Sequence, residues 1–143
     1  MVSESAGTIL EKLIVDWVGT LPAGVVRWTV EEAPMERVVW IDPIRVGAAS
    51  VVLRIADYGG CGVYAGEGLM IEEIRDAPGT IIQMCEGVRD GLLRERVWRW
   101  RNKSVIVHSD LELPSGHWKT FVVRWWLLPL LPRKQEVQYR PWM

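Results

Sequence analysis

The stretch from Arg94 to Leu128 constrains the fold most. It holds five of the nine tryptophans of this 143-residue chain, at positions 98, 100, 118, 125 and 126, in three runs where apolar and polar residues alternate. A period of two is typical of β-strands with one buried face. The sequence therefore predicts three strands joined by two hairpins. The first turn is expected at Asn102-Lys103 and the second at Pro114-Ser115-Gly116.

The second turn sets the predicted register of these strands. A three-residue loop from Pro114 to Gly116 aligns Leu113 with His117, and the two strands pair residue by residue from there. One face is then apolar and is the predicted core. It consists of Trp98, Trp100, Val105, Val107, Phe121, Val123 and Trp125.

The opposite face of these strands carries the candidate site. It combines one histidine, two carboxylates, two arginines and two tryptophans: Arg99, His108, Asp110, Glu112, Trp118, Arg124 and Trp126. Such a face is either the solvated outside of a sheet or a recognition surface. A register shift of one residue would exchange the faces of a strand and change this set.

Two helices and a strand meander are predicted upstream. Residues 9–18 repeat apolar side chains at helical spacing, with Thr8 as N-cap, Glu11 completing a capping box and Gly19 at the end. Period-two stretches at 26–30, 37–41, 51–56 and 61–65, and a further short stretch at 69–74, predict strands. Pro78 starts a second helix and Gly91 ends it.

These elements predict one α+β domain spanning residues 1–143, with 129–143 as a C-terminal tail. The expected architecture is a mostly antiparallel sheet of about seven strands with two helices packed on one face, in the order α-β-β-β-β-(β)-α-β-β-β. Two helices of about 11 residues cover about half of one face of such a sheet. We therefore expect a homodimer, or a curled sheet around a cavity. The tail packs either on its own domain or on a neighbouring subunit.

Charge and hydropathy narrow the location and the partners. The net charge of −1 gives no general attraction to nucleic acid or to an anionic membrane. The apolar run at 121–132 is too short to span a bilayer. Residues 1–7 lack the pattern of a signal peptide, so we expect a cytoplasmic protein. An arginine cluster around Trp98 and Trp100 does not favour nucleic acid, because alternation places those rings on the buried face.

Reactive groups are few. Cys61, Cys85, His108 and His117 lack the spacing of a zinc site, and we expect buried thiols, no metal and no cofactor. The glycines at 59–68 lack the Lys-Ser/Thr of a phosphate-binding loop and are predicted as turns and a bulge. Two carboxylates, Asp110 and Glu112, lie about 7 Å apart on one face of a strand, which is compatible with acid–base catalysis.

The sequence favours a noncatalytic binding protein over an enzyme. We expect it to self-associate and to recognise a protein partner through the polar-aromatic sheet face, as an inhibitor or immunity-type protein would. One alternative is a protein that binds a small aromatic or apolar ligand in an aromatic-lined pocket under a curved sheet. A second alternative is a small hydrolase-type enzyme that uses paired carboxylates.

Overall fold

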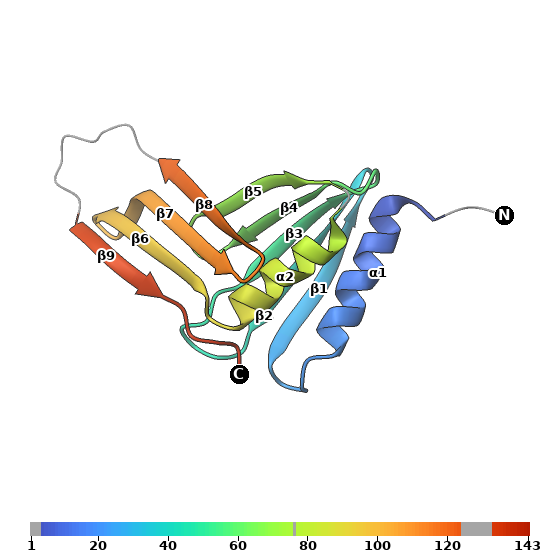
Figure 1. The fold of residues 1–143 in the computed structure, drawn as a ribbon, viewed down its shortest axis with the longest axis horizontal. Helices are drawn as coiled ribbons and strands as arrows, with labels where there is room; N and C mark the ends of the chain where they lie inside the picture. The colour runs from blue at the N-terminus through green and yellow to red at the C-terminus, as the bar shows by residue number, and fades with distance from the viewer. Residues whose placement is uncertain (1–3, 76, 124–132) are drawn as a thin grey trace.

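The computed structural model describes residues 4–75, 77–123 and 133–143. These residues form an α+β fold of two helices and two antiparallel sheets (Figure 1). The first sheet has the strand order β1-β2-β3-β4-β5, and the second has the order β8-β7-β6-β9. The elements are α1 (Ala6–Gly19), β1 (Val26–Ala33), β2 (Glu36–Pro43), β3 (Val51–Ala56), β4 (Cys61–Ala65), β5 (Leu69–Ile74), α2 (Pro78–Arg89), β6 (Leu93–Trp100), β7 (Lys103–Leu113), β8 (Gly116–Val123) and β9 (Arg133–Gln138).

The α+β class, the two helices and the antiparallel pairing are confirmed, but the single sheet is wrong. The described residues form sheets of five and four strands. The fourth strand of the second sheet, β9, lies in the segment predicted as a tail, and it pairs with β6. This pairing joins strands that are not neighbours in the chain, so no hairpin turn in the sequence predicts it.

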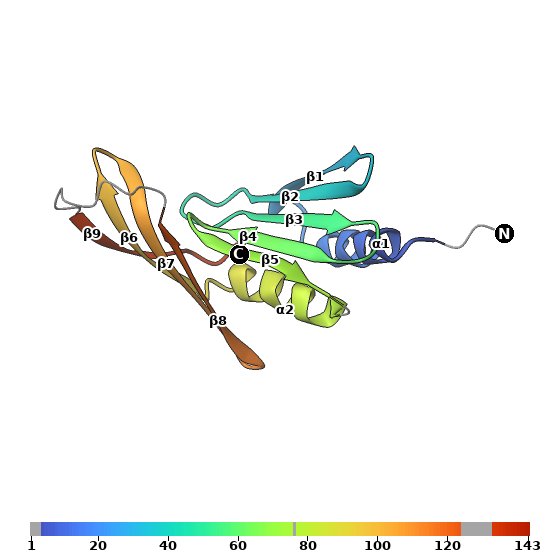
Figure 2. The same ribbon diagram turned by 90° about the horizontal axis from the view of Figure 1, so that it is seen from above.

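Both helices lie on the same side of the first sheet, and the second sheet leans across its end (Figure 2). α1 packs on β2 and β3, whereas α2 contacts β4 on one side and β7 on the other. The core is therefore continuous between the layers. Its fully buried members include Leu53 and Ile55 of β3, Ile81 of α2, and Leu93 and Leu111 of the second sheet. Burying such aliphatic side chains is the main source of stability.

A buried carboxylate joins the two sheets. Glu95 on β6 is 2% exposed. It accepts hydrogen bonds from the backbone N–H groups of Glu67 at 2.8 Å and Gly68 at 2.9 Å, and from the hydroxyls of Ser109 and Tyr139 at 2.5 Å. Four donors replace the water that a buried carboxylate loses. The turn between β4 and β5, residues 66–68, is thereby held against the second sheet.

Two glycines allow that turn to approach so closely. Gly66 has φ +59°, and a Cβ there would lie 2.4 Å from the Glu95 carboxylate. A Cβ on Gly68 would lie 2.6 Å from the Cβ of Val107 on β7. The glycines predicted as turn residues therefore also have a packing role between the sheets.

The C-terminal residues pack on their own domain. Trp142 is 2% exposed, and its indole N–H donates to the carbonyl of Ala49 at 2.9 Å. Its backbone N–H donates to the carbonyl of Arg89 at the end of α2, at 2.8 Å. In the structure, the end of the predicted tail therefore packs on its own domain.

The predicted register of the last hairpin is wrong by one residue. Leu113 pairs with Gly116, so the loop is Pro114-Ser115 alone. Val107 consequently pairs with Val122 and not with Val123. A shift of one residue turns every side chain of a strand to the other face. Trp118, Thr120 and Val122 therefore face the inside of the second sheet, and Phe121 and Val123 face outward.

The preceding hairpin also differs from its prediction. Its turn lies at Arg101-Asn102, which have φ of 49° and 64°, and Trp100 pairs with Lys103. Two positive φ values are typical of the tight turns that match strand twist. A register shift follows between Trp98 and Arg99, after which Trp98 pairs with Ile106. Trp98, predicted in the core, is half-buried on the outward side.

Candidate binding surface

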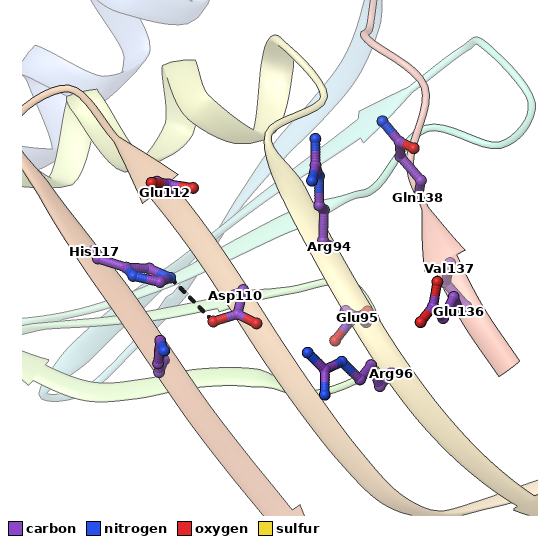
Figure 3. A pocket seen from close by; sticks show the side chains of 10 residues that line it. Arg94, Glu95, Arg96, Asp110, Glu112, His117, Glu136, Val137 and Gln138 are labelled. Atoms are coloured by element: carbon purple, nitrogen blue, oxygen red, sulfur yellow. Dashed lines mark hydrogen bonds and ion pairs between the residues drawn. The ribbon is translucent and has the colours of Figure 1, made fainter. Parts of the chain in front are cut away.

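The outer face of the second sheet is its side opposite the buried residues Val97, Val107 and Leu111. Four strands contribute alternate residues to this outer face. Its polar end contains a pocket of about 480 Å³, called the concave region below (Figure 3). The side chains of the outer face are Arg94, Arg96 and Trp98 from β6, His108, Asp110 and Glu112 from β7, His117, Lys119, Phe121 and Val123 from β8, and Lys134, Glu136 and Gln138 from β9.

The polar end of the outer face carries charges of both signs. Asp110 lies between Arg94 on one neighbouring strand and Lys119 on the other. Its carboxylate is 3.0 Å from Nε2 of His117. Both side chains are more than a third exposed, at 37% and 39%. Solvent screens such a pair, so it contributes little to stability.

Several charged groups of this face have no partner within the described part of the chain. Arg94 and Arg96 point into the concave region from β6, and among residues 4–75, 77–123 and 133–143 neither guanidinium group has a hydrogen bond or ion pair. The same holds there for Lys119, Glu112 and Glu136. The region thus holds unpaired donors and acceptors side by side. Excluding the histidines, its exposed cations (Arg94, Arg96, Lys119) balance its exposed carboxylates (Asp110, Glu112, Glu136).

The other end of the outer face is aromatic. The His108 ring lies between Trp98, at a centroid distance of 5.2 Å, and Phe121, at 4.4 Å in a T-shaped arrangement. Lys134 places its ammonium group 6.0 Å from the centre of the Trp98 ring. Phe121 is 59% exposed. An aromatic ring so exposed beside two others forms an apolar patch next to the charged end.

The structure separates the predicted site residues. His108, Asp110 and Glu112 lie together on the outer face. Arg99 and Trp118 lie on the inner side: Arg99 donates to Glu67 and, at 2.9 Å, to Gln135, and Trp118 packs against the core. Arg124 and Trp126 lie outside the described residues. The outer-face residues that sequence reasoning missed are Arg94, Arg96, His117, Lys119, Phe121 and Glu136, and a two-residue loop at Pro114-Ser115 would have placed those on β8.

The chemistry of the cysteines fits a structural role. Cys61 and Cys85 are free and buried. Burial raises the pKa of the Cys61 thiol to about 12 and also raises the pKa of the Cys85 thiol. At neutral pH both are protonated and unreactive. Within residues 4–75, 77–123 and 133–143, no three His, Cys, Asp or Glu side chains are grouped to hold a metal ion.

Comparisons with known proteins give no information on the function, so the functional proposal is based on the geometry of the outer face. No protein-family model, curated protein or solved structure matches this chain. In the described part of the chain, neither helix is long and apolar enough to cross a membrane.

Proposed function

We propose that this protein is a noncatalytic binding protein that recognises a protein partner through the outer face of the second sheet. The observation that carries the proposal is the pairing of unsatisfied charges with an exposed aromatic patch on one sheet surface. Protein interfaces are enriched in arginine and aromatic residues and have a polar rim. The outer face has this composition, with exposed Phe121 on one side of His108 and Arg96 on the other.

The two arginines are the proposed anchors. Arg94 lies opposite Asp110, yet the hydrogen bond of Asp110 goes to His117. The guanidinium groups of Arg94 and Arg96 therefore keep their donors for carboxylates of a partner, which arginine binds in a two-pronged geometry. Truncating such anchors weakens a complex most.

The size and charge of the outer face support a protein as the occupant. Four strands at a spacing of about 4.8 Å and a length of about 26 Å give a footprint of roughly 500 Å². Side-chain relief brings this toward the about 800 Å² per partner of a stable complex. The carboxylates of Asp110, Glu112 and Glu136 would repel a polyanion. The proposal includes an inhibitor or immunity-type role, self-association and a cytoplasmic location.

Affinity capture from the source cells, followed by titration of the purified partner, tests the proposal. The variant Arg94→Ala/Arg96→Ala is compared with Arg54→Ala/Arg75→Ala, which removes two exposed arginines far from the outer face, one on β3 and one directly after β5. We expect the first variant to bind the partner at least about 30-fold more weakly and the second to bind it like the wild type. A partner that binds the first variant with unchanged affinity would contradict the proposal.

A second candidate is a hydrolase-type enzyme, which the contact between Asp110 and His117 favours. A histidine held by a carboxylate is a suitable general base, and Glu112 lies two residues along the same strand. Asp110→Asn, Glu112→Gln and His117→Ala should then abolish hydrolysis without lowering the melting temperature. Activity that survives all three substitutions would exclude this role.

A small-ligand site is less well supported. The concave region is lined mainly by charged side chains, and the aromatic patch lies on an open surface. Trp98 is a reporter at the boundary of the two, and a panel of aromatic compounds should leave its fluorescence unchanged. Saturable quenching that disappears in Trp98→Phe would favour the small-ligand alternative.

A further inference from the structure

β1 is an edge strand with a regular backbone. It pairs with β2 through eight consecutive residue pairs, from Val26 with Pro43 to Ala33 with Glu36, without a register shift. Its other edge is paired with no strand of the described residues, because β1 stands at the end of the first sheet (Figures 1 and 2). Proteins usually block such edges with proline, with charged side chains, especially lysine, or with a bulge. The sequence of β1, VRWTVEEA, contains no proline or lysine.

The direction of the backbone groups of β1 follows from its pairing with β2. The N–H of Ile44 donates to the carbonyl of Val25 at 2.9 Å, and Pro43, opposite Val26, has no N–H. Antiparallel strands alternate between hydrogen-bonded and non-hydrogen-bonded pairs. The odd-numbered residues of β1 therefore bond to β2. The even-numbered residues, Val26, Trp28, Val30 and Glu32, point their N–H and C=O groups toward the open edge.

We propose that a second copy of the chain pairs with this edge, antiparallel and centred on Thr29, so that the two first sheets join into one. The inference rests on the proposed self-association and names its surface. A two-fold axis at Thr29 places Arg27 opposite Glu31 of the second copy, Trp28 opposite Val30, and Thr29 opposite Thr29. The Arg27–Glu31 and Trp28–Val30 pairs each occur twice, and the Thr29 pair lies on the axis, as an interface between identical copies requires.

All three kinds of pair stabilise antiparallel strands. Opposite charges, an aromatic ring facing a β-branched residue, and two threonines are each favourable across a strand pair. The pairs also keep to their own faces. Trp28 and Val30 lie on the helix side with buried Ile41 and Val39 of β2, and Arg27 and Glu31 lie on the other side. Both pairs of helices thus stay on one side of the joined sheet.

The side chains of β1 are unsatisfied in one copy. Trp28 is 43% exposed, because α1 covers β2 and β3. In the described part of the chain, neither Arg27 nor Glu31 has an ion pair or side-chain hydrogen bond. A two-fold axis at Trp28 or Val30 would still pair side chains on the same face of the joined sheet. It would, however, no longer place Arg27 of one copy opposite Glu31 of the other. The sequence is therefore self-complementary in the register centred on Thr29.

Sedimentation velocity of the full chain across micromolar concentrations tests the pairing. We expect the wild type to show a concentration-dependent dimer. Arg27→Glu places glutamates opposite each other twice, and Glu31→Arg does the same with arginines, so each single variant should be monomeric at concentrations where the wild type is dimeric. An equimolar mixture of the two variants restores both opposite-charge pairs and should form a heterodimer.

The double variant Arg27→Glu/Glu31→Arg provides the internal control. It exchanges the charges and should dimerise like the wild type, whereas Arg54→Glu, on the same sheet away from the edge, should have no effect. If a single variant loses its circular dichroism signal, the double variant decides the question by dimerising or not. A monomeric wild type, or dimerisation unchanged in both folded single variants, would overturn the pairing. Neither result affects capture of a protein by the outer face of the second sheet.

Discussion

The carboxylate of Glu95 accepts a 2.9 Å hydrogen bond from the backbone N–H of Gly68, and this contact ties β6 of the second sheet to the β4–β5 turn of the first. The other oxygen of the same carboxylate accepts from the N–H of Glu67 at 2.8 Å. Both donors come from one turn, and Arg99 and Thr120 of the second sheet also contact this turn, at the Glu67 carboxylate and at the Gly68 carbonyl. The second sheet, and the binding face on its far side, is positioned through these contacts.

We expect Glu95→Gln to lower the free energy of unfolding by about 3 kcal/mol or more, because the amide replaces one acceptor oxygen with a donor and leaves buried donors facing it. Urea denaturation followed by tryptophan fluorescence measures the loss. Ser109→Ala removes only one donor and should cost about 1–2 kcal/mol. A Glu95→Gln variant as stable as the wild type would mean that the carboxylate does not hold the sheets together.

Gly68→Ala tests the close approach of the two sheets. The added methyl group would lie 2.6 Å from the Cβ of Val107, and neither strand can move without disturbing the Glu95 hydrogen bonds. We expect a loss of about 1–3 kcal/mol in unfolding free energy, the usual cost of overpacking. Gly116→Ala is the matched control, since nothing lies within 4 Å of its Cβ position, and it should change stability by less than about 0.5 kcal/mol.

The residues around Glu95 also show how far the sequence predicts the fold. The helices and hairpins follow local rules of apolar spacing and turn residues, so their existence and order are predictable, although the N-cap of α1 is Ser5 and not the predicted Thr8. Arg94, Glu95 and Arg96 are three consecutive charged residues, and nothing in the local sequence indicates that Glu95 is buried. Its burial depends on Glu67, Gly68, Ser109 and Tyr139, which are distant in the chain. The division into two sheets depends on the same distant contacts.

The candidate site was predictable on β7 and not on its neighbours. His108, Asp110 and Glu112 alternate on a strand whose inner residues are apolar, so their shared face follows from the sequence. The faces of the β8 residues depend on the length of the loop at Pro114-Ser115, because a change of one residue exchanges the two faces of the strand. The faces of the β6 residues depend in the same way on the turn at Arg101-Asn102 and on the register shift beside it. Phe121 was accordingly assigned to the core although it is 59% exposed.

The buried thiols predict how stability depends on pH. Burial raises the pKa of Cys61 from 9.0 to about 12, and the pKa of Cys85 is also raised. Above about pH 9 the unfolded chain releases thiol protons that the folded chain retains, so the unfolding free energy should fall as pH rises, by up to about 1.4 kcal/mol per pH unit for each thiol. Cys61→Ala should make this slope shallower by one thiol. Denaturation at several pH values between 8 and 11 checks this, and an unchanged slope in the variant would contradict it.

Trp142 is predicted to anchor the C-terminal segment to α1 and to the loop before β3. Its ring is buried against Trp17 of α1 at a centroid distance of 6.1 Å, and its N–H reaches Ala49. Trp142→Ala should lower the unfolding free energy by about 3–5 kcal/mol, the usual cost of removing a buried aromatic ring. Trp40 is 42% exposed, so Trp40→Ala should cost less. Equal losses in the two variants would argue against the anchor.

The register of β8 can be tested by moving a charge along it by one residue. Val122 pairs with buried Val107 and faces the inside of the second sheet, whereas Val123 is 46% exposed on the outer face. Val122→Glu would bury a carboxylate without a partner and should cost at least about 2–3 kcal/mol. Val123→Glu leaves its carboxylate in water and should cost less than about 1 kcal/mol. The register with a three-residue loop gives the opposite order, because it turns Val123 inward. Urea denaturation of the two variants therefore distinguishes the registers, and with them whether Lys119 and Phe121 belong to the binding face.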